Sequence, residues 1–251
     1  MQLINDHLLG AFREGIPCDM EAAMAALGKK DVDFSYLTEA GAVYSSNIEG
    51  NSVDVNSFMN MKNGDTPKPK EFEEITDLVS AYAFTQTNPL SQENLLEAHG
   101  IFAKRLVSPG NCGKYRQDSV GVFSSHGLVY MAVEAENVKG EMDKLFADIE
   151  ELRQREVSPE EAVYFASYAH LVFAHIHPFM DGNGRAARLL EKWFLAEIAG
   201  ENAWRIESER FYWEHRSDYY RNIHLGPNYY ECDYSQSLPF LRMLPGAICQ
   251  G

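Results

Sequence analysis

The sequence predicts a mainly α-helical protein with one β-hairpin. Apolar residues recur at intervals of three and four, as on one face of a helix, in residues 19–28, 33–50, 71–87, 91–107, 137–154 and 158–176. Residues 118–133 instead gather β-branched and aromatic residues around a turn-like Ser-Ser-His-Gly, which favours a hairpin. A chain of 251 residues that is 45% hydrophobic is long enough to bury a sizeable core.

The helical segments also suggest how the chain is divided. Residues 1–32 are expected to form a helical extension, and residues 33–251 the main domain. Within that domain a helix should begin at about Asn183, and further helices are expected after residue 205.

The helix over residues 158–176 has the clearest start. Ser158 is a good capping residue, Pro159 suits the first helical position, and Glu161 follows in the first turn. The sequence therefore fixes where this helix begins.

The composition argues against several classes of function. The chain has 22 basic and 37 acidic residues, and its net charge of −15 opposes non-specific binding to nucleic acid or to an anionic membrane. The first residues lack the basic start and apolar centre of a signal peptide, and no long apolar stretch follows. We therefore expect a cytoplasmic protein with no nucleic-acid or membrane partner.

The cysteines show no paired spacing. Cys18, Cys112, Cys232 and Cys249 are scattered along the chain, which indicates neither a zinc site nor a disulfide framework. We expect four ordinary thiols.

Residues 177–188, HPFMDGNGRAAR, contain more polar residues and glycines than a connection between two helices needs. A helix that begins after a glycine-containing turn leaves the backbone N–H groups of Gly182, Asn183 and Gly184 unpaired at its N-terminus. The two glycines allow a ligand to approach the backbone closely. This segment therefore predicts an anion site.

The charged residues of the segment refine that prediction. Arg185 and Arg188 supply fixed positive charge on the first turns of the helix. Asp181 would repel a bare phosphate, so its presence favours a Mg²⁺ ion that bridges phosphate oxygens. His177 could accept a proton from an incoming hydroxyl. Together these residues suit a chelated diphosphate.

Each of these features has a simpler explanation when taken alone. A glycine-rich turn is usually only a turn, and a histidine at a helix end often caps the last carbonyls. The combination within 12 residues favours the functional interpretation. His170 and His175, on the preceding helix, have no metal-ligand partners at useful spacing and are expected to be packing or supporting residues.

The segment HPFMDGNGRAAR resembles the signature of the Fic family, His-x-Phe-x-(Asp/Glu)-Gly-Asn-Gly-(Arg/Lys)-x-x-Arg, at every defined position. The resemblance extends to residues 97–116, which end in Gly-Lys-Tyr-Arg, and covers about residues 33–225. It implies a Fic-type helical bundle in which the hairpin forms a flap over the substrate.

The resemblance implies an enzyme that transfers AMP from Mg-ATP to a Ser, Thr or Tyr hydroxyl of a target protein, with release of pyrophosphate. His177 would then be the base and Asp181 the Mg²⁺ ligand. Asn183 and the amides near Gly182 and Gly184 would hold the anion, while Arg185 binds the β-phosphate and Arg188 the γ-phosphate. Phe179 is expected to anchor the loop in the core.

A second motif resembles the inhibitory motif of the same family. In SSNIEGN, residues 45–51, Ser45, Glu49 and Gly50 occupy its defined positions, N-terminal to the core as in the family's second class. An ionised Glu49 near Arg188 would form a charge-assisted, bidentate pair and compete with the γ-phosphate. The alternative is an ordinary helix end, with Glu49 in solvent and Gly50 as a C-cap.

Two further regions are assigned roles by the resemblance. Tyr219 and Tyr220 are candidates to line the nucleotide base, although aromatic stripes more often belong to a core. Val120, Gly121, Val122 and Phe123 are expected to offer a strand edge on which the target docks. The strand that leaves the flap lacks the Pro-Pro pair found in many relatives, which makes flap geometry and target choice harder to predict.

Other functions remain open. The same site could remove AMP, with Glu49 orienting a water, or use another nucleotide donor. A kinase-like branch of the family is disfavoured because it replaces Gly184 by lysine. A nucleotide-sensing binding module is a third possibility, although sensing needs no base such as His177. The resemblance also makes a homodimer plausible.

Overall fold

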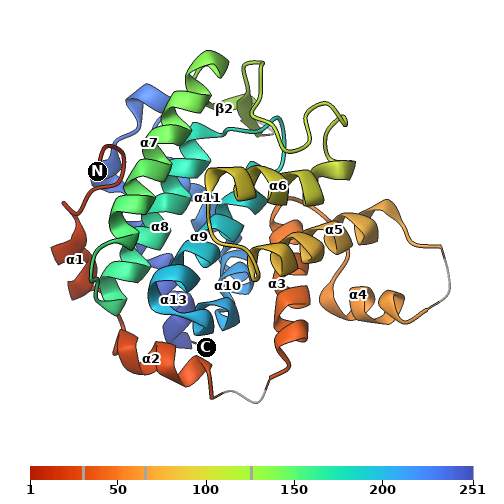
Figure 1. Cartoon of the computed structure of the whole chain (residues 1–251), viewed down its shortest axis with the longest axis horizontal. Helices are drawn as coiled ribbons and strands as arrows, with labels where there is room; N and C mark the ends of the chain where they lie inside the picture. The colour runs from red at the N-terminus through yellow and green to blue at the C-terminus, as the bar shows by residue number, and fades with distance from the viewer. Residues whose placement is uncertain (30–31, 65–66, 125–126, 251) are drawn as a thin grey trace.

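Two buried helices, α8 (Pro159–Ile176) and α9 (Asn183–Ala199), form the centre of the fold (Figure 1). The computed structural model of the chain describes residues 1–29, 32–64, 67–124 and 127–250. α8 begins as predicted, because Ser158 Oγ accepts the N–H of Glu161 at 3.3 Å and the Glu161 carboxylate accepts the N–H of Ser158 at 2.7 Å. The short connection between the two helices carries the candidate site.

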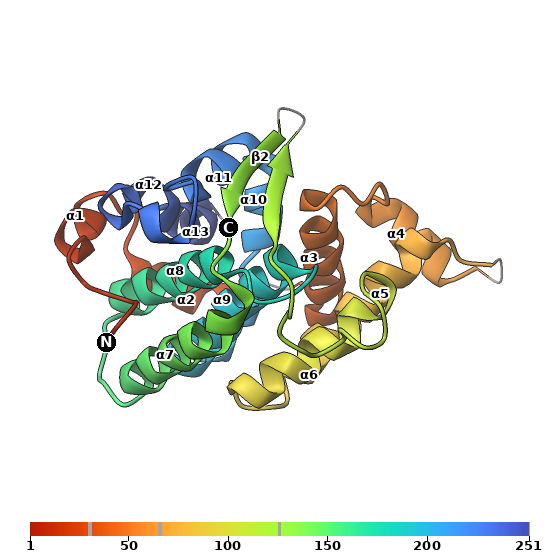
Figure 2. The same cartoon turned by 90° about the horizontal axis from the view of Figure 1, so that it is seen from above.

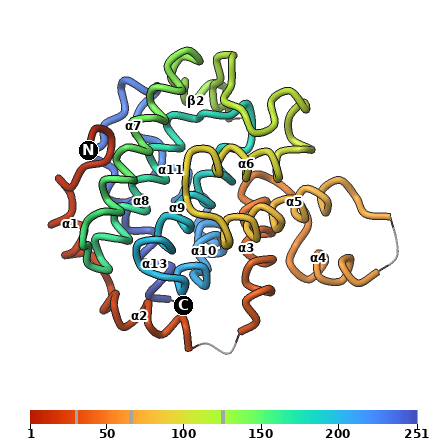
Figure 3. Tube along the Cα trace, viewed as in Figure 1, coloured from red at the N-terminus to blue at the C-terminus, as the bar shows by residue number. Residues whose placement is uncertain are grey.

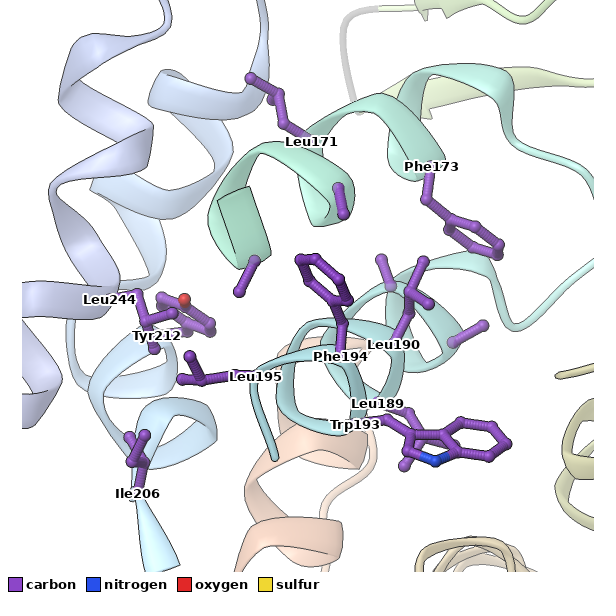
Figure 4. Close-up of a cluster of buried hydrophobic side chains, with 14 of the residues drawn as sticks. Leu171, Phe173, Leu189, Leu190, Trp193, Phe194, Leu195, Ile206, Tyr212 and Leu244 are labelled. Carbon is purple, nitrogen blue, oxygen red and sulfur yellow. The ribbon is translucent and has the colours of Figure 1, made fainter. Parts of the chain in front are cut away.

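The core lies where α8 and α9 face each other and the helices around them. Figure 4 shows Phe194 and Leu190 on α9 directed toward α8 and Phe173 of α8 on the side of Leu190, and all three side chains are buried. α8 is apolar on nearly every face, as expected of a helix in the interior of a bundle. α9 is also buried along most of its length, although it carries Arg185, Arg188, Glu191 and Lys192. The connection that carries the candidate site is therefore anchored at both ends in the buried core.

The remaining helices surround this pair (Figure 3). They are α1 (Leu9–Glu14), α2 (Met20–Leu27), α3 (Phe34–Ile48), α4 (Val55–Lys62), α5 (Lys70–Thr85), α6 (Gln92–Phe102), α7 (Ala135–Arg153), α10 (Ser208–Glu214), α11 (Arg216–Ile223), α12 (Leu238–Leu241) and α13 (Met243–Gln250). The short 3-10 helices are η1 (Ala103–Arg105), η2 (Glu201–Arg205), η3 (Tyr229–Glu231) and η4 (Tyr234–Gln236). None of the helices in the described ranges is long and apolar enough to cross a membrane.

The predicted mainly α fold is confirmed, and each segment with helical spacing contains a helix. One helix, α4, was not predicted. Asp54 caps it by accepting the N–H of Ser57 at 2.9 Å, but Phe58 is its only buried residue, so its apolar pattern is too weak to reveal it. α1 and α2 lie in the predicted N-terminal extension and share the main core through residues such as Phe12 and Met24.

The predicted hairpin consists of β1 (Gly121–Ser124) and β2 (Gly127–Met131), which pair antiparallel. Figure 2 shows the hairpin projecting from the helical body. The register changes between Val122 and Phe123, and residues 125–126 of the expected turn lie outside the described residues. At the end of β2, the N–H of Met131 donates to the carbonyl of Pro227 at 3.0 Å.

The expectation of four ordinary thiols is wrong. Cys18 and Cys249 form a disulfide with a Cα–Cα distance of 5.8 Å, although 231 positions separate them. Sequence spacing could not show this pair because α2 and α13 meet only in the folded chain. The bond ties the N-terminal extension to the last helix. Cys112 and Cys232 are free.

Removing the disulfide should destabilise the protein. We expect Cys18→Ser to lower the free energy of unfolding by about 2–4 kcal/mol, because the bond restricts the unfolded chain over a very long loop. Thermal and urea unfolding of the oxidised protein measure the change. Cys112→Ser is the matched control and should have little effect, and a reductant should lower the wild type to the level of Cys18→Ser. Equal stability of both variants would contradict a stabilising bond.

Candidate active site

The loop between α8 and α9 begins with His177 in an unusual backbone conformation. Its φ of 53° and ψ of 59° lie in the left-handed region, which costs a residue with a Cβ roughly 1–2 kcal/mol. Two hydrogen bonds hold it there: its N–H donates to the Phe173 carbonyl at 3.0 Å, and its carbonyl accepts Nε–H of Arg116 at 2.8 Å. The conformation turns the chain sharply out of α8.

One ring nitrogen of His177, Nε2, has no recorded partner among the described residues. Nδ1 lies 3.1 Å from the carbonyl of Ala174, which can only accept, so Nδ1 carries the proton and Nε2 keeps its lone pair when the ring is neutral. Burial lowers the pKa of His177 below its usual value; the hydrogen bond to Ala174 opposes this shift and the charge of Arg116 adds to it. The ring is therefore suited to accept a proton at neutral pH.

Asn183 and His99 fix the rest of the loop. The Asn183 side chain accepts the N–H of Phe179 and donates to its carbonyl, both at 2.8 Å. Phe179 is buried, as expected, and its ring stacks on His99 with centroids 3.7 Å apart. His99 Nε2 lies 3.0 Å from the carbonyl of Asp181, and its Nδ1 accepts the N–H of Gly113 at 3.0 Å. Burial lowers the pKa of His99 to about 4, which keeps this pair of bonds intact.

The N-terminus of α9 offers backbone donors, with one difference from expectation. Gly182 has a φ of 87° and precedes the helix, but its N–H is not free, because it donates to Oδ1 of Asp181 at 2.5 Å. The structure records no partner for the N–H groups of Asn183, Gly184 and Arg185 within the described residues. The expected donor set thus shifts by one residue along the helix. The Asn183 side chain is already engaged in the loop, so it could meet an anion only through its backbone.

Arg185 and Asp181 flank this helix end. Arg185 is buried, its guanidinium lies 3.5 Å from Asp181 Oδ1, and its Nε–H has no partner in the described structure. A buried donor without a partner is costly, so this site favours an anion that Arg185 could bind. The side chain of Asp181 is 53% exposed and faces the same space from the solvent side.

Arg188 lies one turn further along α9 and is 0% exposed. Its Nε–H donates to Ser45 Oγ at 2.9 Å, and one terminal nitrogen donates both to the Ser45 carbonyl at 2.9 Å and to Glu49 Oε1 at 2.7 Å. The other terminal nitrogen donates to the hydroxyl of Tyr219 at 3.2 Å. The structure thus brings Ser45 and Glu49 of the second motif onto Arg188. The Glu49 contact is a single hydrogen bond rather than the bidentate pair that was expected.

Glu49 covers the N-terminus of α9. A Cβ added at Gly184 would collide with Glu49 Oε1, so the carboxylate lies directly against this glycine. Burial would raise the pKa of Glu49, but the charge of Arg188 and its hydrogen bond more than offset this and lower the pKa. Gly50, with a φ of 96°, ends α3 as a left-handed cap. The end of α3 is therefore an ordinary helix terminus, and it also places the Glu49 carboxylate at the start of α9, against Gly184 and Arg188.

The two tyrosines proposed to line a base lie in different environments. Tyr219 is 2% exposed, and its ring packs against Tyr212 and Phe240 with centroids 5.1 and 5.9 Å away. Tyr220 is 43% exposed, and its hydroxyl donates to the carbonyl of Ile48 at 2.8 Å. Of the two, only Tyr220 has a ring that a ligand could reach.

Two side chains, those of Arg116 and Tyr130, connect the hairpin to the end of α8 and the loop that follows it. The buried guanidinium of Arg116 donates to the carbonyls of His177, Asp118 and Val133, at 2.8, 2.9 and 2.5 Å. The Tyr130 hydroxyl donates to the carbonyl of His175 at 2.7 Å. Arg116 has no acidic partner among the described residues and serves to hold backbone segments together.

The exposed part of the hairpin carries the residues expected to dock a target. Val120, Gly121, Val122 and Phe123 lie on or just before β1, and Phe123 is 71% exposed.

The sequence analysis missed His99 as a support of the loop. It also gave Arg116 only as the end of a resembling segment, because neither lies close in sequence to the residues it holds.

Comparison with known sequences points to one family. Residues 89–195 match the Fic/DOC family. The chain is 28% identical over 172 residues to the protein adenylyltransferase Fic of Drosophila persimilis, and a relative with the same name from Drosophila erecta matches equally well. The alignment covers 64% of this chain but only 31% of the Drosophila persimilis protein, so the chain spans about a third of that relative's length.

Solved structures show the same fold. A Fic family protein from Desulfovibrio desulfuricans G20 superposes with a TM-score of 0.72 at 23% identity, over 92% of this chain and 71% of that one. Fic-1 from C. elegans, residues 134–508, gives a TM-score of 0.69 at 17% identity, over 97% of this chain and 72% of the other. Residues 89–195, which include the signature on the α8–α9 loop, thus match the Fic/DOC family, and the chain shares the fold of solved Fic proteins.

Proposed function

We propose that this chain is an autoinhibited protein adenylyltransferase, which transfers AMP from ATP to a hydroxyl of a target protein. The observation that carries the proposal is the position of Glu49, whose carboxylate sits on Arg188 and against Gly184 at the N-terminus of α9. That helix end is the place where backbone N–H groups and two arginines would otherwise bind phosphates. The names of the curated relatives support the same activity.

The donors at the helix end match the phosphates of a nucleoside triphosphate. Arg185, with its unpartnered Nε–H, would bind the β-phosphate. A guanidinium has five N–H groups, and Ser45 and Tyr219 use three of those on Arg188. When Glu49 moves away, one N–H on each terminal nitrogen is free to bind a γ-phosphate with two parallel bonds.

The residues fit a magnesium ion. No group of three metal-ligating side chains gathers anywhere in the described ranges, but Mg²⁺ in nucleotide sites is usually held by one or two carboxylates together with phosphates and waters. Asp181 supplies such a carboxylate, largely exposed and next to the phosphate donors. Bound there with the nucleotide, the ion would neutralise charge on the α- and β-phosphates.

The reaction follows from the position of His177. Nε2 would take the proton of the target hydroxyl as the oxygen attacks the α-phosphorus. The bond between the α-phosphorus and the bridging oxygen breaks, and pyrophosphate leaves. The N–H groups at the start of α9 would stabilise the negative charge that develops on the phosphates. The target keeps the AMP, and the proton passes from His177 to solvent.

Glu49 should restrain this reaction, and replacing it by glycine should release it. An ion pair at a partly buried site contributes roughly 1–4 kcal/mol, so we expect Glu49→Gly to raise transfer from labelled ATP by about ten- to several-hundred-fold. Glu49→Gln, which keeps a hydrogen-bond acceptor but loses the charge, should give a smaller increase.

A double variant tests the pairing itself. Arg188→Ala removes both the restraint and the γ-phosphate contact, so Glu49→Gly added to it should not restore transfer. If Glu49→Gly alone leaves transfer at the wild-type level, the end of α3 is only a helix terminus. Faster loss of AMP from a modified target in the wild type than in Glu49→Gly would favour AMP removal instead.

His177 should act as the base. We expect His177→Ala to reduce transfer by about 10²–10⁴-fold in the Glu49→Gly background while ATP binding changes by only a few-fold. Because the pKa of His177 lies below the usual value of about 6.5, transfer should be constant above that pH and fall as the pH drops through the lowered pKa.

The matched control for this prediction is His7→Ala, which removes an exposed histidine outside the site. Transfer is measured with labelled ATP between about pH 5 and 8, a range that brackets the usual histidine pKa. Activity of His177→Ala equal to that of His7→Ala would exclude His177 as the base. An acid limb centred above pH 6.5 would contradict the burial of the ring.

The free edge of β1 should bind the target through its backbone. The N–H of Ala132 donates to the Val120 carbonyl at 3.1 Å, while Met131 points its N–H the other way, to Pro227. Because neighbouring residues of a strand alternate in direction, Gly121, the partner of Met131, directs its N–H and carbonyl away from β2. No strand among the described residues pairs with this edge.

Two substitutions of Gly121 distinguish the effect of losing its N–H from the effect of adding a side chain. A Cβ at this position meets Leu128 in either variant, but proline also removes the N–H. We expect Gly121→Pro to lower target modification about two- to tenfold below Gly121→Ala, the effect of one lost hydrogen bond. ATP affinity should be equal in both. Equal target modification would show that the target docks elsewhere.

A further inference from the structure

A row of buried polar side chains runs behind Arg188, away from the phosphate site. Tyr219 on α11 accepts from Arg188 at 3.2 Å, and its hydroxyl lies 3.0 Å from Nε2 of His170 on α8. Nδ1 of His170 lies 2.8 Å from the carboxylate of Glu191, one turn beyond Arg188 on α9. Arg188, His170 and Glu191 are 0% exposed and Tyr219 is 2% exposed. The row therefore joins a buried cation to a buried carboxylate across three helices.

The hydrogen bonds of this row point in one direction. A guanidinium can only donate and a carboxylate can only accept, so the two ends of the row are fixed. Arg188 donates to Tyr219, Tyr219 donates to Nε2, and Nδ1–H donates to Glu191. Burial raises the pKa of Tyr219 although the charge of Arg188 opposes this, so the hydroxyl keeps the proton that it donates.

The carboxylate at the far end of the row, that of Glu191, is not paired with a lysine or arginine in the described structure. Glu191 accepts from the Tyr212 hydroxyl at 2.8 Å. A buried carboxylate is costly without partners, and chains of hydrogen bonds in a low-dielectric interior strengthen one another. The row thus lets Glu191 stabilise the charge of Arg188 without touching it.

This support matters most when Glu49 is displaced. Arg188 then loses its nearest carboxylate and keeps only Ser45 and Tyr219 as partners. The Ser45 contacts involve Nε and one terminal nitrogen, so Tyr219 alone holds the other terminal nitrogen. Without that bond the guanidinium could rotate about its last side-chain torsions, and its two free N–H groups would no longer face one phosphate.

We propose that Tyr219, backed by His170 and Glu191, is a positioning residue that orients Arg188 toward the γ-phosphate and thereby selects nucleoside triphosphates over diphosphates. The proposal rests on the function assigned above to Arg188. It gives Tyr219 a different role from the base-lining one expected from its sequence position, because its ring is enclosed by Tyr212 and Phe240. Its hydroxyl acts through Arg188 and not on the ligand.

The test compares ATP with ADP, which lacks the γ-phosphate. Calorimetry with Mg²⁺ gives both dissociation constants for Glu49→Gly and for Glu49→Gly combined with Tyr219→Phe. We expect Glu49→Gly to bind ATP more tightly than ADP, and Tyr219→Phe to weaken ATP binding about tenfold, as for a lost hydrogen bond to a charged group, while ADP binding is unchanged. KM for ATP should rise in the same proportion, with little change in kcat.

Two further variants guard against a general structural effect. Tyr168→Phe removes the hydroxyl of a different buried tyrosine, on α8, which accepts from Asn5 at 2.6 Å, and should leave both affinities unchanged. Glu191→Gln removes the charge at the end of the row without changing its size, and should also weaken ATP binding selectively.

The outcomes separate the two proposals. Equal weakening of ATP and ADP in Tyr219→Phe, or an unchanged preference for ATP, would overturn the positioning role while leaving the proposed function intact. If Glu49→Gly itself binds ATP and ADP equally, Arg188 does not contact a γ-phosphate, and both the assignment of Arg188 and the role of Tyr219 are wrong.

Discussion

The burial of the Arg188 guanidinium is the constraint on which the site depends. A charge with no solvent exposure requires close partners, and those of Arg188 come from two distant parts of the chain. Ser45 and Glu49 reach it from the end of α3, and Tyr219 reaches it from α11. Burial opposes its charge, yet Tyr219 and Glu49 raise the pKa of Arg188 above the usual value. The arginine therefore stays charged and gathers these elements at the start of α9.

The same constraint explains how one carboxylate could regulate the site. Glu49 satisfies Arg188 with a strong contact, but it is the most replaceable partner, because its side chain is 29% exposed and it sits at the last turn of a helix. A phosphate offers the same charge and geometry. Under the proposed function, Glu49 and a phosphate would compete for the same guanidinium, and the outcome would depend on which anion is present and on how firmly α3 is held. The Tyr220 hydroxyl, which binds the carbonyl of Ile48, is one of the contacts that hold it.

The loop between α8 and α9 is held by a separate set of contacts. It contains a left-handed glycine, which adopts this conformation at little cost, and a left-handed histidine, which does not. Asn183 and His99 bind its backbone from within the fold, and Arg116 binds it from the segment that leads to the hairpin. Three buried side chains thus hold the loop around the strained backbone of His177. They connect His177, the start of α9 and the segment that leads to the hairpin.

The sequence by itself determined the features that depend on near neighbours. The capping box of Ser158, the start of α9 at Asn183 and the residues of the signature are all set by groups within a few positions of one another. The hairpin followed from its β-branched residues in the same way. Weak local signals were missed, as at α4, where one buried phenylalanine supports the whole helix.

Only the tertiary structure decided the long-range pairs. The disulfide of Cys18 with Cys249, the support of the loop by His99 and the buried row behind Tyr219 join residues from separate elements, many of them far apart in sequence. The capture of the Gly182 N–H by Asp181 was local, yet the sequence left two acceptable partners for that donor, solvent anion or side chain. The spacing of apolar residues shows which face of a helix is buried, but not which residues of another helix it will contact. Those contacts are determined by how the helices pack, and the packing depends on the side chains of the whole core.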